Sequence, residues 1–483
     1  MISTQGQKER VVILGSGWAG YAFARTLDPK KFERIMISPR SYFVFTPLVA
    51  GTAVGTLEFR AVMESVRRLG LDHYHQGWAD DVDFSRKVIR VEANTSDDIA
   101  AKTIGTGPVK KGAMFDVPYD KLVVAVGSYS QTFGIEGVKE HANFLRDVSD
   151  ARKIRMKVLQ RFEKAALPMT SDKERRKLLH FAVVGGGPTG IEFAAQLHDL
   201  VHDDLSKTYP DLVKEKDLVQ ITVYDVADKV LPMFDRKLAQ YATDTFMRER
   251  IVVKTEHHLT RIRRDPELDG CLKLKITECG DEEVSAGLVV WSTGLMQNPL
   301  VAKLGMKTLP TEKNGSTGGT ASAMKIQRDA KSGGLIIDRH LRVTTATSDS
   351  SAALGNDEST EAVTKDTDIL PDVFSIGDCA TVQGEQFPAT AQVASQQASY
   401  LAKRLNKGDV DSKTFKYRDW GVMTYLGGWK AIHQSSADEL QGWAAWVLWR
   451  TAYLTKSMSV RNKIMVPVYW VMSWLFGRDI SRF

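Results

Sequence analysis

Two glycine-rich turns in this chain have the spacing that lets a backbone hold a pyrophosphate. They are Gly15-Ser16-Gly17-Trp18-Ala19-Gly20 and Gly185-Gly186-Gly187-Pro188-Thr189-Gly190. In a G-x-G-x-x-G turn the glycines permit a tight bend and bring the phosphates to free N–H groups at the start of a helix. A single turn of this kind could also be a glycine-rich bend without a ligand, but two of them predict two dinucleotide sites.

Each turn lies in the strand–turn–helix context that such a site requires. An apolar strand at 11–14, a helix at 21–27 and a second strand at 34–38 surround the first turn. The second turn has a strand at 181–184, a helix at 191–200 and a strand at 219–224. The continuous apolar runs are typical of buried parallel strands. We therefore expect two β-α-β units in two domains.

The residue after each unit's second strand bears on the bound nucleotide. Rossmann units usually have an acidic residue there, which accepts hydrogen bonds from ribose. The first unit has Ser38-Pro39-Arg40 instead, so that a hydroxyl could bind ribose more weakly and Arg40 could reach a phosphate. The second has Asp225, whose carboxylate would repel a 2′-phosphate. This predicts NADH rather than NADPH at the second site.

Three further strand ends could bring backbone close to a cofactor. They contain Ala125 and Gly127, Thr293 and Gly294, and Gly377 and Asp378. Polar segments at 94–117, 311–333 and 344–368 are expected to be loops, the last two on either side of a short strand at 334–338.

Composition narrows the class of protein. Lys and Arg are spread along the chain and nearly matched by Asp and Glu, giving a net charge of +6, so we expect no nucleic-acid partner. The three cysteines, Cys271, Cys279 and Cys379, form no C-x-x-C pair. This fits a reducing compartment and argues against electron transfer through a disulfide. We also expect no metal site.

The C-terminal segment has a different character. Residues 442–454 are rich in aromatic side chains, and in a helix Trp446, Trp449 and Tyr453 would share one face. The stretch 464–476 has Ser473 as its one polar residue, contains Pro467, which would kink or start a helix, and is flanked by Arg461, Lys463, Arg478 and Arg482. Spanning a bilayer takes about 20 apolar residues, so these helices are expected to lie in the membrane interface. Their Trp and Tyr rings would lie at headgroup depth, and the flanking Arg and Lys side chains would contact lipid phosphates. A buried core helix or a dimer interface is the alternative.

These motifs resemble the type II NADH:quinone oxidoreductases, above all the rotenone-insensitive branch of fungal and plant mitochondria. The resemblance rests on the two glycine turns, on segments 38–43 and 376–380, and on two more specific segments, Ala391-Gln392-Val393-Ala394-Ser395-Gln396-Gln397 and the ending 476–483. It covers nearly the whole chain apart from the loops.

The resemblance implies an α/β fold with two Rossmann-like domains of the disulfide-reductase type and a C-terminal membrane-anchoring helical region. The implied domains are an FAD-binding domain at 8–175 that resumes at 334–405, an inserted NADH-binding domain at 176–333, and a membrane-association or dimerisation region at 406–483. It further implies a homodimer on the mitochondrial inner membrane, with the membrane face left open. Residues 1–10 carry no signal or transit peptide, so a targeting segment is either absent or precedes this numbering.

The resemblance also assigns residues to sites. For FAD these are Gly15, Gly17, Trp18, Ala19, Gly20, Ser38, Pro39, Arg40, Thr46, Pro47, Ala125, Gly127, Gly377 and Asp378. For NADH they are Gly185, Gly187, Pro188, Thr189, Gly190, Glu192, Asp225, Thr293 and Gly294. Gln392 and Gln396 would hydrogen-bond a quinone carbonyl, and Glu192 would order the nicotinamide or relay protons. A role at the first turn of its own helix is the alternative for Glu192.

The implied activity is hydride transfer from NADH to FAD and transfer of two electrons to membrane ubiquinone, without proton pumping. Two alternatives remain. A sulfide:quinone oxidoreductase would need paired cysteines at the flavin. A protein like apoptosis-inducing factor, with a redox-sensing role or nucleic-acid binding, would need a concentrated basic face for such binding.

Overall fold

The computed structural model describes residues 8–94, 112–309, 324–347, 367–457 and 459–481. Most of the predicted loops at 94–117, 311–333 and 344–368 lie outside this part, as do the start of segment 1–10 and Arg482. The loop prediction is wrong at their described ends, because Met114–Pro118, Met324–Ile326, Arg342–Thr347 and Thr367–Ser375 pair as strands. The chain forms two compact units, described separately below. Unit 1 comprises Met1–Phe43, Ser65–Tyr129 and Leu295–Arg418, and unit 2 comprises Val44–Glu64, Ser130–Gly294 and Asp419–Phe483. The domain boundaries given above remain a prediction.

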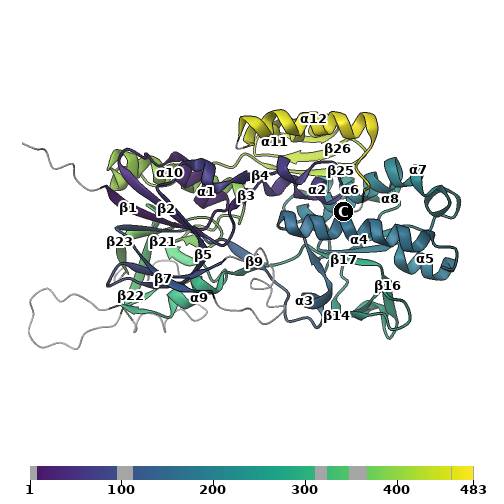
Figure 1. Cartoon of the computed structure of the whole chain (residues 1–483), viewed down its shortest axis with the longest axis horizontal. Helices are drawn as coiled ribbons and strands as arrows, with labels where there is room; N and C mark the ends of the chain where they lie inside the picture. The colour runs from purple at the N-terminus through teal and green to yellow at the C-terminus, as the bar shows by residue number, and fades with distance from the viewer. Residues whose placement is uncertain (1–7, 95–111, 310–323, 348–366, 458, 482–483) are drawn as a thin grey trace, which may run out of the picture. The chain divides into compact units, whose positions relative to one another are not determined.

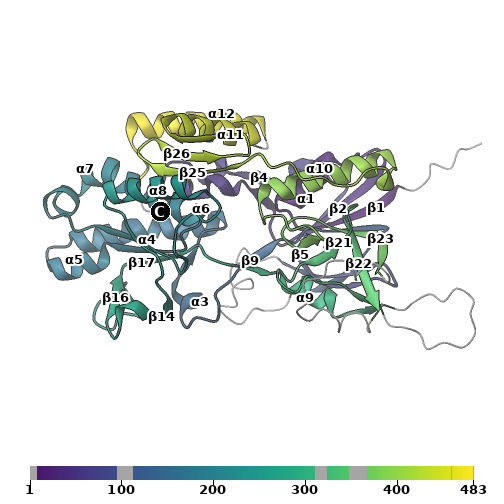
Figure 2. The same ribbon diagram turned by 180° about the vertical axis from the view of Figure 1, so that it is seen from behind.

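Unit 1 is built on a parallel sheet core. Its adjacent strands are β23 (Thr367–Ser375), β8 (Lys121–Val124), β1 (Glu9–Leu14), β2 (Phe32–Ser38) and β5 (His73–Asp83). The apolar residues 11–14 of β1 are fully buried because both neighbours pair with this strand. Helices α1 (Trp18–Thr26) and α10 (Ala391–Lys407) lie side by side against it (Figures 1 and 2).

Shorter elements complete unit 1. Antiparallel strands extend both edges of the sheet: β6 (Val88–Ala93), β7 (Met114–Pro118), β19 (Thr308–Leu309), β20 (Met324–Ile326) and β22 (Arg342–Thr347). Unit 1 also contains β21 (Leu335–Ile337), β24 (Ala380–Val382) and α9 (Pro299–Gly305). Strands β3 (Tyr42–Val44), β4 (Met63–Ser65), β9 (Ser128–Ser130) and β18 (Leu295–Gln297) are at or beside the points where the chain passes between units.

Unit 2 contains a second parallel sheet. Its strands, in spatial order, are β10 (Asn143–Phe144), β17 (Leu288–Trp291), β11 (His180–Val184), β12 (Gln220–Tyr224) and β13 (Val252–Lys254). Its helices are α2 (Val49–Ala53), α3 (Val138–His141), α4 (Val148–Ala166), α5 (Asp172–Leu178), α6 (Pro188–Asp199), α7 (Ser206–Thr208) and α8 (Arg236–Arg248). A small antiparallel sheet adds β14 (Leu259–Arg264), β15 (Leu272–Ile276) and β16 (Glu283–Ala286).

Both predicted β-α-β units are confirmed. The first is β1, α1 and β2, and the second is β11, α6 and β12. The long crossover after α6 is largely helical, with π-helical turns at Leu200–Leu205 and Asp211–Glu215.

The C-terminal part of unit 2 is a three-stranded sheet covered by two helices. The sheet has β25 (Val422–Gly427), β26 (Lys430–Gln434) and β27 (Glu439–Gly442), and the helices are α11 (Trp443–Lys456) and α12 (Val460–Phe476) (Figure 1). Pro467 lies inside α12 rather than at its start. Among the described helices, none combines the length and apolarity needed to cross a bilayer.

A capping box fixes the start of α4, the longest described helix of unit 2. Asp147 accepts hydrogen bonds from the first turn, and Asp150 accepts one from the Asp147 N–H at 3.1 Å. Replacing Asp147 with Ala is expected to cost about 1 kcal/mol, which lowers the unfolding midpoint of a unit of this size by about 2–4 °C. Differential scanning fluorimetry checks this, with the exposed Glu163→Ala on the same helix as control. An unchanged midpoint for Asp147→Ala would contradict the role of the cap.

Candidate functional site

The first glycine turn leaves an open space where a pyrophosphate would approach. Gly15 has φ +104°, and a Cβ there would lie 2.4 Å from the Ala125 carbonyl oxygen. A Cβ at Gly20 would lie 2.0 Å from the Gly15 oxygen, so this glycine lets helix and strand pack closely. Gly17, the N-cap of α1, has no atom within 4 Å of its Cβ position. The three glycines therefore serve three different needs, as in dinucleotide-binding turns.

The second turn repeats this geometry in unit 2. Gly185 has φ +115°, and its Cβ would lie 2.9 Å from the Ser292 carbonyl carbon. A Cβ at Gly190 would lie 2.0 Å from the Gly185 oxygen, and Gly187 again has open space and is the N-cap of α6. Pro188 and Thr189 are the first residues of α6. Both turns thus present helix N–H groups to an open space, which fits a bound dinucleotide in each unit.

Asp225 is tied to the second turn itself. One carboxylate oxygen accepts from the Gly186 N–H and the other from the Ala227 N–H at 2.8 Å. This holds the carboxylate at the end of β12, beside the glycine turn. Its contact with ribose remains a prediction.

The corresponding residues of unit 1 behave differently. Ser38 is buried, and its hydroxyl lies 2.8 Å from the Ser16 hydroxyl and accepts from the Arg40 N–H at 3.3 Å. The Pro39 carbonyl accepts from the Asn94 amide at 3.1 Å. The Trp18 ring packs edge-on against Phe43 at 5.1 Å. Ser38 therefore helps to shape the first turn.

The Gly377–Asp378 segment meets α1 and α10. Gly377 has φ +80°, and its Cβ would lie 3.2 Å from that of Ala19. Its N–H donates to the buried Gln397 side chain at 2.7 Å, and Asp378 accepts from the Ser128 hydroxyl at 3.0 Å. Sequence reasoning did not assign Gln397, although it follows Gln396 directly. A polar residue on the buried face of a helix was the available signal.

The two glutamines expected at a quinone have local partners within unit 1. Gln392 accepts from the Tyr417 hydroxyl at 2.8 Å. The Gln396 amide donates to the Arg418 carbonyl at 2.8 Å and accepts from the Arg418 N–H at 3.0 Å. Their contact with a quinone remains a prediction.

Unit 2 contains a cavity of about 840 Å³. Helix α6 supplies Glu192, Gln196 and Asp199, which lie on one helical face. One part of the remaining wall is aromatic and apolar and comes from α2 and the turn before it, β25, α11 and α12: Pro47, Leu48, Tyr425, Trp446, Trp449, Trp470 and Trp474. Another part is polar and charged and comes from residues 202–214 and from Arg450 and Arg478. Thr46 begins the short helical turn that carries Pro47. Of the predicted NADH residues, Glu192 is the one that faces this cavity.

Glu192 is a carboxylic acid held in a poorly solvated position. It is 8% exposed, and its Oε1 accepts from the Trp449 indole N–H at 3.1 Å and the Tyr425 N–H at 3.2 Å. Burial raises its pKa to about 7, against the opposing effect of the two hydrogen bonds. The alternative role at the first turn of α6 is wrong, because that turn holds no acidic residue. Near neutral pH this group can both donate and accept a proton.

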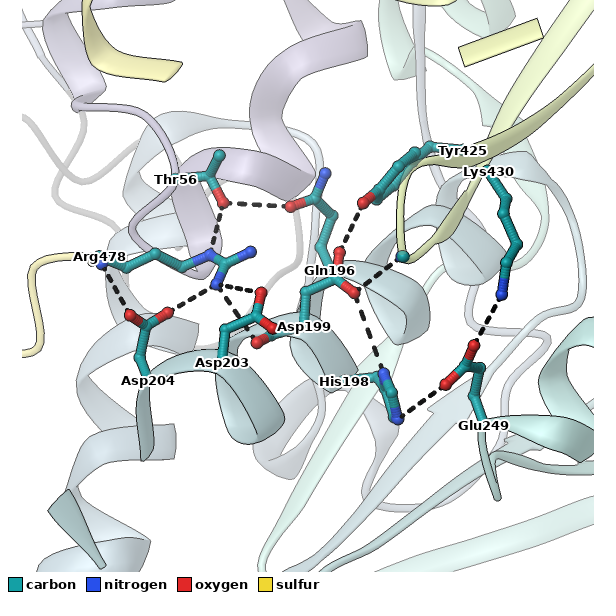
Figure 3. Close-up of polar contacts among 11 residues, drawn as sticks. Thr56, Gln196, His198, Asp199, Asp203, Asp204, Glu249, Tyr425, Lys430 and Arg478 are labelled. Carbon is teal, nitrogen blue, oxygen red and sulfur yellow. Dashed lines mark hydrogen bonds and ion pairs between the residues drawn. The ribbon is translucent and has the colours of Figure 1, made fainter. Parts of the chain in front are cut away.

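A polar network closes one side of the cavity (Figure 3). Tyr425 donates to Asp199 at 2.6 Å, and Gln196 accepts from Thr56 at 3.1 Å. Arg478 donates to Asp204 at 2.6 Å and to the Thr56 hydroxyl at 3.0 Å. The network therefore ties the chain after α12 to α6 and to segment 44–64.

Two expectations for the C-terminal region are corrected here. Arg478 was expected on lipid phosphates, but its ion pairs with Asp203 and Asp204 point it inward. The face of Trp446 and Trp449 was expected at a membrane, but both rings are buried and pack on Trp429 at 4.9 Å and Tyr425 at 5.5 Å. Both rings belong to the core of unit 2, because β25 and β26 pack on this face of α11.

The cysteines offer no disulfide chemistry. All three are free thiols, with Cys271 and Cys379 buried. Burial raises the pKa of Cys271 to about 11 and also raises that of Cys379, so both are neutral thiols. Within the described ranges, no group of three or more His, Cys, Asp or Glu side chains could hold a metal ion.

Two parallel sheets, each with a dinucleotide turn, define the class of two-Rossmann pyridine-nucleotide oxidoreductases. The family model for pyridine nucleotide-disulphide oxidoreductases matches residues 9–319, and that for the NDH2 C-terminal domain matches residues 420–479. A probable NADH dehydrogenase of Dictyostelium discoideum is 36% identical over 99% of this chain and 92% of its own length. The mitochondrial external alternative NAD(P)H-ubiquinone oxidoreductase B3 of Arabidopsis thaliana is 33% identical over 100% and 92%.

The NDH2 of Plasmodium falciparum, solved in complex with NADH, has the same fold, with a TM-score of 0.78, 24% identity, and coverage of 98% of this chain and 100% of that one. This chain belongs to the type II NADH dehydrogenase family. The family resemblance and the fold class predicted from the sequence are both confirmed.

The open space beside Gly17 in the first turn and Gly187 in the second yields a paired prediction. Gly17 and Gly187 both have φ −74°, which any residue can adopt, and their Cβ positions meet nothing. Gly187→Val is therefore expected to fold and keep its FAD but to raise the KM for NADH about ten-fold or more, because the side chain fills the pyrophosphate space. Gly17→Val is expected to lose FAD instead. Flavin absorbance and NADH titration measure the two effects, and wild-type values for either variant would contradict the corresponding assignment.

Proposed function

We propose that this chain catalyses FAD-dependent electron transfer from NADH to ubiquinone without pumping protons. Family membership along the whole chain supports this activity over that of a redox-sensing flavoprotein. The observation that carries it furthest is the cavity in unit 2, where the buried acid Glu192, with its pKa raised to about 7, stands beside the aromatic rings of Trp449 and Tyr425. A flat apolar ring with two carbonyls, which needs protons when reduced, suits such a cavity.

We propose that the first turn, with Ser38, Arg40 and Asp378, holds FAD, and that the second turn, with Asp225, Thr293 and Gly294, holds NADH in preference to NADPH. The domain boundaries predicted from the sequence go with this assignment. The bound FAD would supply the redox chemistry between the two substrates, as acceptor of a hydride from NADH and donor of two electrons to the quinone. Gln392 and Gln396 would offer amides to a quinone carbonyl, and the backbone bonds of Gln396 to Arg418 would fix its amide in one orientation.

Glu192 would supply protons during quinone reduction. Its pKa of about 7 leaves much of the carboxyl protonated at neutral pH, while an ordinary glutamic acid would be ionised. Trp449 and Tyr425 hold the ionised form once the proton has left, because both donate to Oε1. The rings of Trp449 and Tyr425 limit the access of water to the carboxyl of Glu192, a residue that is 8% exposed.

The direct test of the activity is anaerobic. NADH added to the purified protein in detergent should bleach the flavin absorbance, and a short-chain ubiquinone should restore it rapidly. NADPH should bleach the flavin more slowly. Bleaching that persists after quinone is added would contradict the proposed function.

Glu192→Gln tests the proton-donating role. In the wild type, quinone reduction should slow as pH rises through about 7, since the acid form is lost there. In the variant this step should be about ten-fold to a hundred-fold slower at pH 6 and lose that pH dependence, because an amide gives no proton. Stopped-flow flavin reoxidation measures it, and exposed Glu163→Gln is the control. An unchanged pH profile in Glu192→Gln would contradict the role.

Helix α12 supports membrane attachment. Its single polar residue in 464–476, Ser473, donates to the Thr56 carbonyl at 3.0 Å, so it faces the protein. The opposite face is a row of exposed apolar side chains at helical spacing: Ile464, Val468, Val471 and Leu475. We propose that this row rests in the interface of the inner mitochondrial membrane, in keeping with the mitochondrial relative.

Replacing two members of the row tests this. Val468→Gln with Val471→Gln, at residues 53% and 52% exposed, should lower partition onto liposomes about ten-fold or more, because buried apolar area is lost. Met169→Gln with Met247→Gln, at residues 79% and 71% exposed elsewhere on unit 2, should not change it. Co-sedimentation measures both. Equal binding of the first pair and wild type would contradict membrane contact through α12.

We further propose a homodimer through the C-terminal region and no nucleic-acid partner. The exposed aromatic side chains of this region outside the membrane-facing row, Trp443, Trp474 and Phe476, support the first, and the near balance of Lys and Arg with Asp and Glu supports the second. A monomer by light scattering in detergent would remove the dimer. The sulfide:quinone alternative lacks support, because Cys271 and Cys379 are buried neutral thiols.

A further inference from the structure

A second cavity of unit 2, of about 290 Å³, shares no lining residue with the cavity at Glu192. Gly287 and Leu288 line it where β17 begins, and Asn143 lines it where β10 begins. The second glycine turn and Thr293–Gly294 instead follow the carboxyl ends of β11 and β17. This cavity therefore lies at the amino ends of the parallel strands, whereas the dinucleotide turn lies at their carboxyl ends.

Two cations from adjacent turns of α4 line this cavity. Arg161 is 9% exposed, and its Nε donates to the Gly287 carbonyl at 2.8 Å. Lys157 donates to the Asn143 side-chain oxygen at 2.7 Å, and Asn143 is itself fixed by its donation to the Val289 carbonyl at 3.0 Å. Of the carboxylates that the structure describes, none forms an ion pair with either cation. Both side chains are thus held in place by neutral oxygens.

The groups that could neutralise these cations are engaged elsewhere or uncharged. Asp265 is buried between Lys177 at 3.6 Å and Lys273 at 3.7 Å, and Asp269 pairs with Lys164 at 3.2 Å. Burial keeps the Cys271 thiol neutral by raising its pKa to about 11. The exposed Glu140 and Arg264 also line the cavity and offset one another in charge.

Holding two cations that form no ion pair close together in a partly desolvated place is unfavourable. Burial and mutual repulsion lower the pKa of Lys157, and burial lowers that of Arg161, although the charge of Asp269, at the same cavity, acts on Arg161 in the direction that raises its pKa. Gly270, with φ +85°, makes room for the guanidinium, since a Cβ there would lie 2.7 Å from Nη1 of Arg161. The Lys157 ammonium has three N–H donors, and its bond to Asn143 uses one of them. The Arg161 guanidinium has five N–H donors, and its bond to Gly287 uses one of them.

We propose that this cavity binds a small oxyanion, a phosphate or carboxylate group held between Lys157 and Arg161. The anion would accept hydrogen bonds from the remaining N–H groups, and its negative charge would balance the two cations. The planar guanidinium of Arg161 can donate two parallel hydrogen bonds to two oxygens of such a group. The cavity has room for a small organic acid or phosphate ester around that group. This proposal does not depend on the proposed function.

The test uses the full chain with FAD and saturating NAD⁺, so that both dinucleotide turns are occupied. Inorganic phosphate and, separately, malonate are titrated calorimetrically at constant ionic strength. Wild type should bind at least one of them saturably, with one site per chain. Lys157→Gln should weaken that binding about ten-fold or more, because a charged donor is lost. Lys153→Gln, an exposed neighbour one turn earlier on α4, should change it less than about two-fold.

Binding of phosphate alone would identify a phosphate site, and binding of malonate alone a carboxylate site. Absence of saturable binding of both anions to wild type would overturn the proposal, as would binding unchanged by Lys157→Gln. Should Lys157→Gln fold poorly, Arg161→Lys gives the same test, because it keeps the charge but loses the planar fork and should weaken binding to a similar extent.

Discussion

The burial of one carboxylic acid is the constraint on which the cavity of unit 2 depends. Removing Glu192 from water is unfavourable unless it stays protonated or its oxygens are hydrogen-bonded. Both conditions are met: the pKa of Glu192 is raised to about 7, and its Oε1 accepts hydrogen bonds from Trp449 and Tyr425. Glu192 also lies on α6, the helix whose N-cap is Gly187. One helix thus joins a dinucleotide turn to the wall of the cavity.

The C-terminal segment combines two kinds of surface that are usually separate. Its inner side is tied to unit 2 by Arg478, whose ion pairs to Asp203 and Asp204 fix the chain after α12. Its outer side is the apolar row of α12. The inner face of α12 holds the polar Asn462 and Ser473 together with the buried apolar Val466 and Trp470, so the helix carries apolar side chains on both faces. Such a helix can stay attached to the protein while offering its outer apolar face to a lipid surface.

The features that the sequence predicted correctly are mostly local. The glycine turns at Gly15 and Gly185 follow from steric needs within a few residues, and the buried strands beside them follow from apolar runs. The directions of Trp449 and Arg478 could not be read, because each is decided by partners far away in the chain, Glu192 and Asp204. The sequence pointed to Gln392 and Gln396 but not to Gln397, because the role of Gln397 depends on which face of α10 is buried. The perturbed pKa of Glu192 likewise exists only once α11 and β25 cover it.

The most direct test of the account is the protonation state of Glu192. Infrared difference spectra of wild type and Glu192→Gln over a pH series would isolate the carbonyl band of this one protonated carboxyl. The account predicts a band that is present in wild type at pH 6, absent from the variant, and lost with a midpoint near pH 7. A band lost near the ordinary value of 4.5 would contradict it, because the group would then be fully ionised at neutral pH and would have no proton to give.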